Sequence, residues 1–421
     1  TIAATHFGGG VFVGGIEWGV EKGVWPGAYA GIGLGLTCFI SAIIAGKFRE
    51  IADGITPPDF IEHRYGHSKF LRGYHAIVYI LGTVAIIACQ FMAFGSMASA
   101  FGISYKTAVL LGTVVVIIYT YMAGMWGVAI TDFIQLGMCI LFIPIIAVLG
   151  GQIIAAEHSV TIGDLLSQPF FPQADSTSDF LYTTVPSVLG SIFAYEYFIR
   201  WQSSKNAKDA KNSCIYAGII LIALSIPIGI ISGIGKVMYP DTPAGDVLGK
   251  VITSTLPGWA GVLFLAAVLS AIMSTADSLM TSLGGMVTRD LYHKVFNHDK
   301  DFNELKNVLL YTKLTAVIGS IGGCIVALNF RSILGALFWM SPLQGGALFA
   351  PVVIGLFWKG ANRYGAFAAV ITGGLMALVD MSGLYTWPER MLFPILGSAI
   401  ALVVVSLVTK DMEQNKLEAV N

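Results

Sequence analysis

The sequence predicts an all-α integral membrane protein with about twelve membrane-spanning helices. Charged residues make up 12% and hydrophobic residues 55% of its 421 residues, whereas a soluble domain carries roughly 25% charged residues. The mean hydropathy is +0.75. The apolar residues gather in windows of roughly 18 or more, the length that crosses the hydrocarbon core of a bilayer. Strands are not expected, because a membrane barrel shows short segments of alternating polarity.

The apolar windows place the expected spans along the chain. In order they are 2–22, 25–46, 73–101, 105–124, 127–154, 179–202, 212–238, 258–288, 305–329, 331–358, 362–382 and 388–409. With the start of span 1 in the cytoplasm, eighteen of the 24 Lys and Arg residues lie inside, as cytoplasmic loops require. The loop 155–178 contains none and suits the outside. We therefore expect a multi-pass protein of the plasma membrane, with the start of span 1 and the C-terminal tail cytoplasmic.

Several function classes are disfavoured by the composition. The net charge of −1 provides no basic surface for nucleic acid. The five cysteines fall in apolar segments without metal-ligand spacing, so we interpret them as small buried side chains. The chain has no HExxH motif, CxxC pair, Gly-x-Ser-x-Gly elbow or phosphate-binding loop, so an enzyme is not expected.

Two spans contain residues that interrupt helices. Gly8, Gly9 and Gly10 follow one another in span 1, and each weakens a helix by roughly 1 kcal/mol relative to alanine. Span 10 contains "FWMSPLQGGALFAP", with two prolines and two adjacent glycines. Loosened backbone at membrane depth persists where it lines a protein-enclosed cavity, and discontinuous helices place unpaired carbonyls beside ions. The alternative is close helix packing through small residues.

Span 8 contains an oxygen-rich stretch, "LSAIMSTADSLMTS", from Leu269 to Ser282. At helical spacing, one face carries Ala271, Ser274, Thr275, Ser278 and Thr281, with Asp277 on its flank. A hydroxyl in a membrane helix can bond to the carbonyl one turn back, but a cluster of oxygens suits a small hard cation. An acid at membrane depth is costly unless paired, solvated or protonated. Alternatively, Asp277 ends the span in cytoplasmic water.

Four stretches carry a more specific pattern. They are "ATHFGGGVFVGG", "YTYMAGMWGVAITDFIQ" (Tyr119–Gln135), "AIMSTADSL" and "GLFWKGANRYGA" (Gly355–Ala366). Together they resemble the solute:sodium symporter family, nearest in pattern to the branch that contains the high-affinity choline transporters. One departure is Ala123, which replaces the first glycine of a pair. The loop ending "DFIEHRYG" resembles the family's cytoplasmic amphipathic helix after span 2.

The resemblance implies a leucine-transporter-type fold with two inverted five-helix repeats and discontinuous spans 1 and 10. The first repeat is then 1–154 (spans 1–5), followed by an extracellular loop at 155–178. The second repeat is 179–358 (spans 6–10), and two extra helices with a cytoplasmic tail occupy 359–421. The family has one helix before span 1, which fits a chain that opens at Thr1 inside an apolar stretch.

The resemblance also implies a sodium ion held between the break in span 1 and span 8. Its ligands are the backbone carbonyls of Ala4, Phe7 and Ala271 and the hydroxyls of Ser274 and Thr275. Some members hold a second sodium, at positions that correspond to Asp132, Ser274, Asp277 and Ser278. Those members have hydroxyls at both later positions, so Asp277 departs from them. It binds sodium more tightly, titrates as a proton site, or points elsewhere.

The substrate is harder to predict. In the choline branch, aromatic residues occupy the positions of His6, Ala194 and Phe338, and such rings attract quaternary ammonium groups. Having His6 in place of a tryptophan favours a polar solute instead. The candidate substrate-binding residues are His6, Gly8, Gly9, Gln90, Tyr195, Glu196, Phe338, Trp339 and Gln344. Two of them have structural alternatives: His6 as a packed neutral histidine, and Glu196 as the partner of Arg200 one turn on.

These features predict a sodium-coupled secondary symporter that imports a small polar solute, amino acid or carboxylate-like, by alternating access. The alternatives are a quaternary-ammonium symporter, a proton-coupled transporter, and a channel or sensor on the same fold. The expected partners are sodium, the solute and the lipid bilayer. The oligomeric state stays open, and a monomer is compatible with this function. Glu17, in the outer half of span 1, is either a gate residue or a side chain that reaches outer water.

Overall fold

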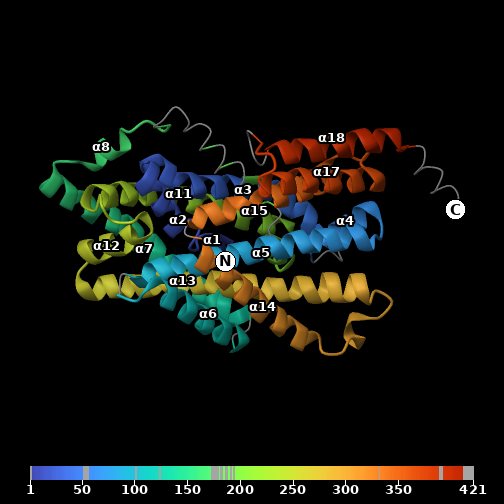
Figure 1. The fold of residues 1–421 in the computed structure, drawn as a ribbon, viewed down its shortest axis with the longest axis horizontal. Helices are drawn as coiled ribbons and strands as arrows, with labels where there is room; N and C mark the ends of the chain where they lie inside the picture. Colours follow the sequence, from blue (N-terminus) through green and yellow to red (C-terminus); the bar gives the residue numbers. More distant parts are fainter. Residues whose placement is uncertain are drawn as a thin grey trace.

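The structure is a computed structural model that describes residues 2–50, 56–99, 102–122, 125–171, 180, 184, 188–189, 192, 195–330, 332–387 and 392–410. Within these residues the regular structure is helical, without strands. The helices run roughly along the long axis of an elongated bundle (Figure 1). In a helix the backbone N–H and C=O groups pair within the segment, as the interior of a bilayer requires.

The elements have the following bounds. In chain order they are α1 (Ile2–His6), α2 (Phe12–Lys22), α3 (Val24–Glu50), α4 (Pro57–Tyr65), α5 (Lys69–Ser99), α6 (Tyr105–Met122), α7 (Met125–His158), α8 (Ile162–Leu166), α10 (Tyr195–Gln202), α11 (Ala207–Met238), α12 (Ala244–Thr255), α13 (Gly258–Gly285), the π-helix η1 (Met286–Phe296), the short helix η2 (Phe302–Glu304), α14 (Val308–Asn329), α15 (Ile333–Phe349), the π-helix η3 (Ala350–Ile354), α16 (Gly355–Phe357), α17 (Arg363–Met381) and α18 (Leu392–Val408).

Eight helical segments in the described part of the chain are long and apolar enough to cross a membrane, and two shorter ones are also apolar. Of the expected spans, most correspond to a single long helix, with boundaries shifted by a few residues. Span 8 is longer than expected, because α13 continues directly into η1. In the expected span 6, most of the residues before Tyr195 lie outside the described part of the chain, and α10 is its described final part.

Span 1 is interrupted, as its three glycines predict. Helix α1 ends at His6 and α2 begins at Phe12, so the residues 7–11 between them are not helical. Span 10 differs from the expectation. Helix α15 passes through Pro342 without a break, and the irregular part comes later, in the π-helix η3 that contains Pro351. Neighbouring helices and local π-helical adjustments let a membrane helix accommodate proline. Pro342 and the two glycines therefore did not mark the irregular part, and among the prolines and glycines only Pro351, at the end of the stretch, lies in it.

Two elements outside the spans bear on the function. The amphipathic helix expected after span 2 is α4, which begins with a capping box between Thr56 and Asp59 and has proline in its first turn. Helix α12, which precedes α13, was not expected. Its apolar face is buried, with Val247, Val251 and Ile252 inside the bundle. This amphipathic helix is shorter than a membrane span, so a search for long apolar windows does not detect it.

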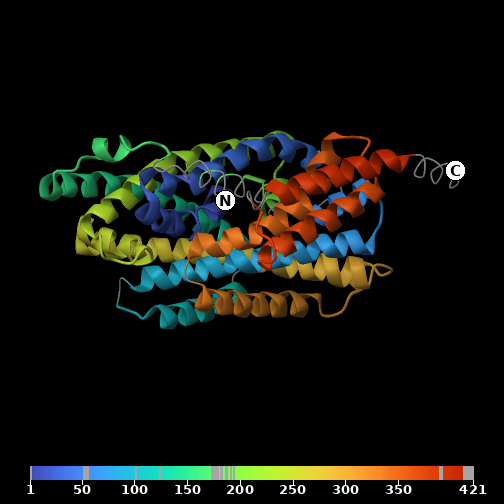
Figure 2. The same ribbon diagram turned by 45° about the horizontal axis from the view of Figure 1, so that its top comes forward.

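Small residues allow the helices of the bundle to pack closely. Helix α11 packs along α3, where a Cβ on Gly218 would lie 2.9 Å from the carbonyl oxygen of Gly35. In lipid the hydrophobic effect does not drive helices together, so close packing of this kind stabilises their association instead. The turned view shows α3 and α11 side by side again (Figure 2).

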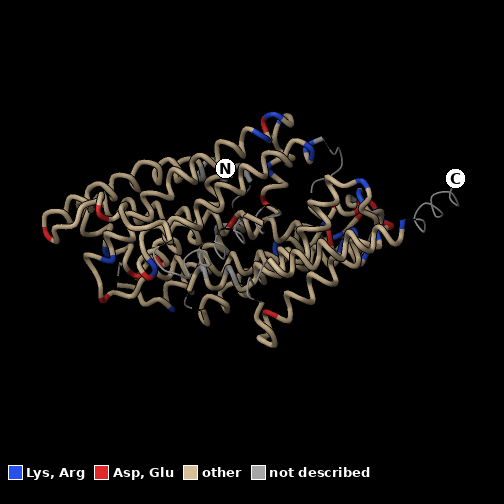
Figure 3. The backbone as a smooth tube through the Cα atoms, turned by 90° about the horizontal axis from the view of Figure 1, so that it is seen from above, with Lys and Arg blue, Asp and Glu red and all other residues tan. Residues whose placement is uncertain are grey.

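Charged residues gather toward the two ends of the bundle, and its middle carries few of them (Figure 3). More Lys and Arg lie at the end that also carries α4 and the C-terminus. Large apolar side chains such as Ile118, Val262 and Ile318 are more than half exposed on its sides. The apolar sides with charged ends fit a molecule surrounded by lipid.

Candidate ion and solute site

The break in span 1 leaves backbone oxygens without helical partners. The amide of Phe7 still donates to the carbonyl of Ala3, at 2.8 Å. Within the described part of the chain, no donor reaches the carbonyl oxygens of Ala4 or Phe7. The end of a helix leaves its last carbonyls free in this way, so both oxygens are available to a cation or water.

The break packs closely against spans 3 and 8, because its glycines have no side chains to keep the backbones apart. A Cβ on Gly8 would lie 2.7 Å from Oε1 of Gln90 and 2.8 Å from Oγ1 of Thr275. A Cβ on Gly9 would lie 2.3 Å from that of Ala93. The Gly9 amide donates to Gln90 Oε1, at 2.8 Å. Glycine is therefore needed here for close approach of the backbone to α5 and α13.

Three of the predicted sodium ligands surround one small cavity. The cavity has a volume of about 10 Å³, room for roughly one water-sized particle. Its lining residues are Ala4, Phe7, Ala271, Gln135, Leu136 and Cys139. They come from the break, from α13 and from α7, so the cavity lies where these three elements meet.

The two hydroxyl residues assigned to the sodium site are buried in α13. Ser274 is 4% exposed and Thr275 is 3% exposed. The hydroxyl of Thr275 donates to the carbonyl of Ala271, at 3.1 Å, which is the local bond that such residues make in membrane helices. Of these two hydroxyls, that of Thr275 lies beside the break, next to Gly8. The sodium assignment itself stays a prediction.

The residues of the second proposed site are only partly described. Asp277 and Ser278 are both buried in α13, with Asp277 1% exposed. The alternative that Asp277 ends the span in cytoplasmic water is therefore wrong, since the helix continues through α13 and η1. Asp132 lies in α7, and its side chain is outside the described part of the structure.

The candidate substrate residues of span 6 are buried and lie next to groups that contact other parts of the protein. Arg200 donates to the backbone carbonyl of Glu196, at 3.1 Å, and to the hydroxyl of Thr5. The described hydrogen bond between these two residues therefore reaches the Glu196 backbone, and the alternative that their side chains pair stays a prediction. Tyr195 and Glu196 are both buried. The His6 ring packs on Tyr197, with 4.3 Å between centroids, and its Nδ1 donates to the Ile2 carbonyl at 3.0 Å.

The candidates of span 10 divide into two groups. Gln344 packs against α5, where a Cβ on Gly82 would lie 1.9 Å from its Nε2. Trp339 is 40% exposed and packs on the ring of Phe330, so in this conformation it faces the outside rather than the break. The side chain of Phe338 lies outside the described residues, as does Ala194.

Glu17 is buried at the opposite end of span 1 from α4. It is 9% exposed, and the Ile333 amide donates to its Oε2 at 3.4 Å. This places a carboxylate at the first turn of α15, where the positive end of the helix dipole favours negative charge. The interpretation that Glu17 reaches outer water is therefore wrong.

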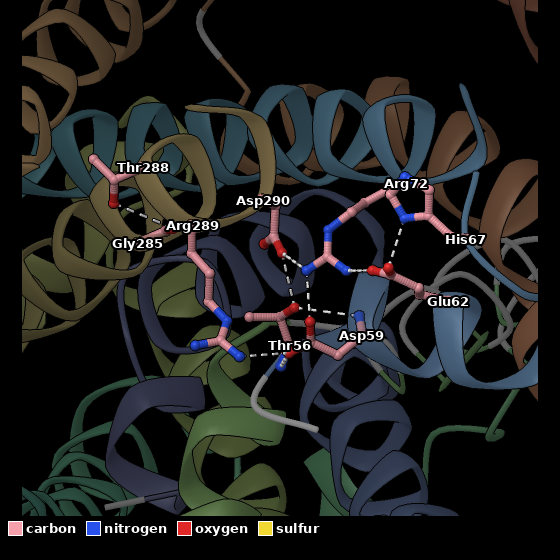
Figure 4. Close-up of polar contacts among 9 residues, drawn as sticks. All are labelled: Thr56, Asp59, Glu62, His67, Arg72, Gly285, Thr288, Arg289 and Asp290. Carbon is pink, nitrogen blue, oxygen red and sulfur yellow. Dashed lines mark hydrogen bonds and ion pairs between the residues drawn. The ribbon is translucent and has the colours of Figure 1, made fainter. Parts of the chain in front are cut away.

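An ionic cluster at the α4 end was missed by the sequence analysis (Figure 4). Arg72, 1% exposed, contacts Asp59 at 2.5 Å, Asp290 at 2.8 Å and also Glu62. Arg289 contacts Asp59 at 3.2 Å. Burial alone raises the pKa of Glu62, but the hydrogen bond with His67 and the charge of Arg72 hold that pKa below its ordinary value. The signal available in the sequence was an acidic pair one turn apart on α4, followed by Arg72.

Comparison with known proteins decides the family. The model of the sodium:solute symporter family matches residues 1–373. The chain belongs to the sodium:solute symporter family. It is therefore a membrane transporter rather than an enzyme, and sodium is the coupling ion that its family implies.

The relatives of this symporter transport different solutes. The chain is 28% identical to sodium/proline symporter 2 of Staphylococcus saprophyticus, over 88% of this chain and 75% of that protein. It is 26% identical to the sodium/pantothenate symporter of Escherichia coli, over 90% and 80%. The human high affinity choline transporter 1 is 27% identical, over 89% and 67%. A shared family therefore leaves the solute of this symporter open.

Solved structures share its fold. A substrate-bound, outward-open Na⁺-coupled sialic acid symporter matches with a TM-score of 0.74 and 18% identity, over 98% of this chain and 88% of that one. The inward-facing conformation of Mhp1 matches with a TM-score of 0.57 and 12% identity, over 98% and 90%. At these identities the likeness concerns the fold, which is that of leucine-transporter-type transporters.

Proposed function

We propose that this protein is a sodium-coupled symporter that imports a small polar solute, amino acid or carboxylate-like, by alternating access. The observation that carries the proposal is the cavity between the break in span 1 and span 8. Ala4, Phe7 and Ala271 line it, and the backbone carbonyls of Ala4 and Phe7 accept no hydrogen bond from the described residues. One dehydrated sodium ion fits a cavity of this size. Ser274 and Thr275 follow Ala271 on α13 but do not line the cavity, so their hydroxyls are proposed to turn toward the ion when it binds.

Sodium at this position would couple two parts of the molecule. An ion that binds both the break and α13 stabilises the state in which they are close, and it loses those ligands when they separate. Coupling of this kind is a difference in affinity between two states, so solute and sodium tighten each other reciprocally. Each sodium that moves inward through −100 mV releases about 2.3 kcal/mol.

The polar character of the solute is inferred from the groups near the break. Gln90 contacts Gly9 directly, and His6 is the last residue of α1, next to the break. Tyr195 and Glu196 are assigned to the site by the family resemblance alone. The relatives that transport proline and pantothenate support a solute with a carboxylate. The human choline transporter supports the alternative, a quaternary ammonium, which would require an aromatic cage that His6 does not supply.

A second cation at Asp277 and Ser278 is a further part of the proposal. Both side chains are buried on the same helix as the first site. Asp132 would complete the site from α7, and the ion there is either sodium or a proton. We also propose that spans 1–5 and 6–10 form the two inverted repeats and that the α4 end faces the cytoplasm.

A thermal-stability screen of the purified protein tests this function. The panel contains amino acids, carboxylates, sugars and quaternary amines, each with sodium or potassium. We expect stabilisation that is specific to sodium, is lost in Ser274→Ala and is weakened in Asp132→Asn. If both variants respond to sodium like the parent, the site assignment is wrong. If choline stabilises best, the polar-solute assignment is wrong.

A further inference from the structure

Helix α4 is bound through its polar residues to the ends of α5 and η1. Arg72 of α5 lies between Asp59 and Glu62 of α4 and Asp290 of η1 (Figure 4). The hydroxyl of Thr56, which caps α4, donates to Asp290 at 2.9 Å. Removing one partner from a buried ionic cluster leaves an uncompensated charge, so contacts of this kind resist separation. The first turns of α4 are thereby fixed to spans 3 and 8.

The last turn of α4 is bound to the end of span 10. Arg64 donates to three backbone carbonyls that follow η3, those of Gly355, Trp358 and Lys359, at 2.8–3.1 Å. The hydroxyl of Tyr65 donates to the carbonyl of Pro351, at 2.7 Å. The carbonyls at the end of a helix need partners of this kind. Helix α4 therefore joins spans 3, 8 and 10 through directional polar contacts.

The neighbouring spans 1, 2 and 6 are joined by polar contacts of their own. Gln202 of α10 donates to the carbonyl of Phe48 in α3, at 2.7 Å. Arg49 of α3 donates to the carbonyl of Ser204, at 2.8 Å. Arg200 donates to the hydroxyl of Thr5 in α1. The ends of these three spans thus form a second group joined by hydrogen bonds. Away from α4, the Lys47 ammonium of α3 also lies 4.3 Å from the ring centroid of Phe357 in α16, so a cation–π contact links this group to the end of span 10.

The described contact between the two groups at α4 is aromatic. The ring of Phe60 in α4 packs on Phe48, with 5.0 Å between centroids. Phe48 packs in turn on Phe198 at 4.7 Å and on Trp201 at 5.9 Å. Apolar contacts are not directional, whereas hydrogen bonds weaken steeply when their geometry changes. When the helix ends move, the aromatic contact is therefore the one expected to open.

We propose that α4 is a clamp that makes the inner ends of spans 3, 8 and 10 one body, and that the inner path opens between Phe60 and Phe48. This inference rests on the proposed function, because it assumes alternation between two states under the control of sodium. It assigns Arg64 and Arg72 as positioning residues for transport that contact neither ion nor solute.

Distances between spin labels test the clamp in the whole protein. Cysteines are introduced at His63 on α4, Lys359 after span 10 and Lys205 after span 6, all exposed. The five native cysteines are buried, which favours labelling at the new positions. The pair 63–359 lies within the clamped group, and the pair 63–205 spans the aromatic contact. Double electron–electron resonance is recorded in sodium and in potassium.

The expected result is a distance that stays constant for 63–359 and shifts by several ångström for 63–205 when sodium replaces potassium. Equal shifts in both pairs would refute the clamp and leave sodium coupling intact. No shift in either pair would refute sodium coupling and the clamp together. The failure of the clamp is therefore distinguishable from the failure of the proposed function.

The substitution Arg64→Gln tests the positioning role. It removes the donors to three carbonyls, so we expect the 63–359 distances to broaden and the transport rate to fall several-fold at an unchanged half-saturating sodium concentration. Arg64→Lys cannot form the same fork and should restore only part of the rate. Lys69→Gln removes an exposed positive charge from the same end and is the matched control. Unchanged 63–359 distances in Arg64→Gln would overturn the assignment.

Discussion

The amide of Gly9 donates to Oε1 of Gln90 at 2.8 Å, and this bond joins the break in span 1 to the middle of span 3. Both groups are buried, with Gln90 3% exposed. A non-helical segment in a membrane protein needs partners for its backbone from neighbouring side chains. Gln90 thus supports the position of the break, whose residue Phe7 lines the candidate ion cavity.

Replacing Gln90 with methionine should destabilise the break. The side chain keeps its length but loses the acceptor, which leaves the Gly9 amide unpaired at a cost of about 1–3 kcal/mol. We expect a lower apparent unfolding temperature and weaker sodium-dependent stabilisation in a thermal-shift assay. Gln152→Met changes an exposed glutamine of α7 in the same way. Equal unfolding temperatures for the two variants would contradict the role of Gln90.

Replacing Gly8 with alanine should weaken sodium binding. The new Cβ would lie 2.7 Å from Gln90 Oε1 and 2.8 Å from Thr275 Oγ1, so one of the two side chains must move. We expect an affinity for sodium about tenfold lower, or about 1.4 kcal/mol, measured by sodium titration of thermal stability. Gly10→Ala is the control, because a Cβ there meets no atom within 4 Å. A parent-like titration for Gly8→Ala would show that sodium binding does not depend on the close approach of Gly8 to Gln90 and Thr275.

The features that sequence predicted well are those encoded in short, continuous stretches. Gly8–Gly10 located the break in span 1, because consecutive glycines weaken a helix wherever they occur. Helical spacing put Thr275 on the oxygen-rich face of span 8, and its Oγ1 lies next to Gly8 in the break. The stretch "DFIEHRYG" predicted α4 through its resemblance to the family's amphipathic helix after span 2.

The features that sequence did not predict depend on which side chains meet across the bundle. Arg72 is more than two hundred residues from Asp290, and no periodic pattern pairs them. Trp339 was assigned to the substrate site by its place in span 10, but only the helix rotation decides that it faces outward. Glu17 was read as either a gate or a surface residue, because its contact with the first turn of α15 is equally distant in sequence.

Glu17→Gln should separate the charge of this contact from its hydrogen bond. The amide of glutamine keeps an acceptor for the Ile333 amide but loses the negative charge at the first turn of α15, which contributes about 0.3–1 kcal/mol. Glu17→Ala loses both and should lower the unfolding temperature further. Glu21→Gln, exposed one turn later on α2, controls for the change in net charge. If Glu17→Ala behaved like Glu21→Gln, the contact with α15 would not contribute to stability.

Replacing Arg72 with methionine should be the most destabilising of these changes. Asp59, Glu62 and Asp290 all contact this guanidinium, and removing one partner of a buried ion pair costs about 3–5 kcal/mol. Asp290→Asn removes one negative charge and keeps an acceptor for Thr56, so we expect a smaller loss. Because Arg72 then faces fewer carboxylates, the double variant should lose less than the sum of the single variants. Additive losses in unfolding temperature would mean that Arg72 and Asp290 act independently, contrary to their 2.8 Å contact.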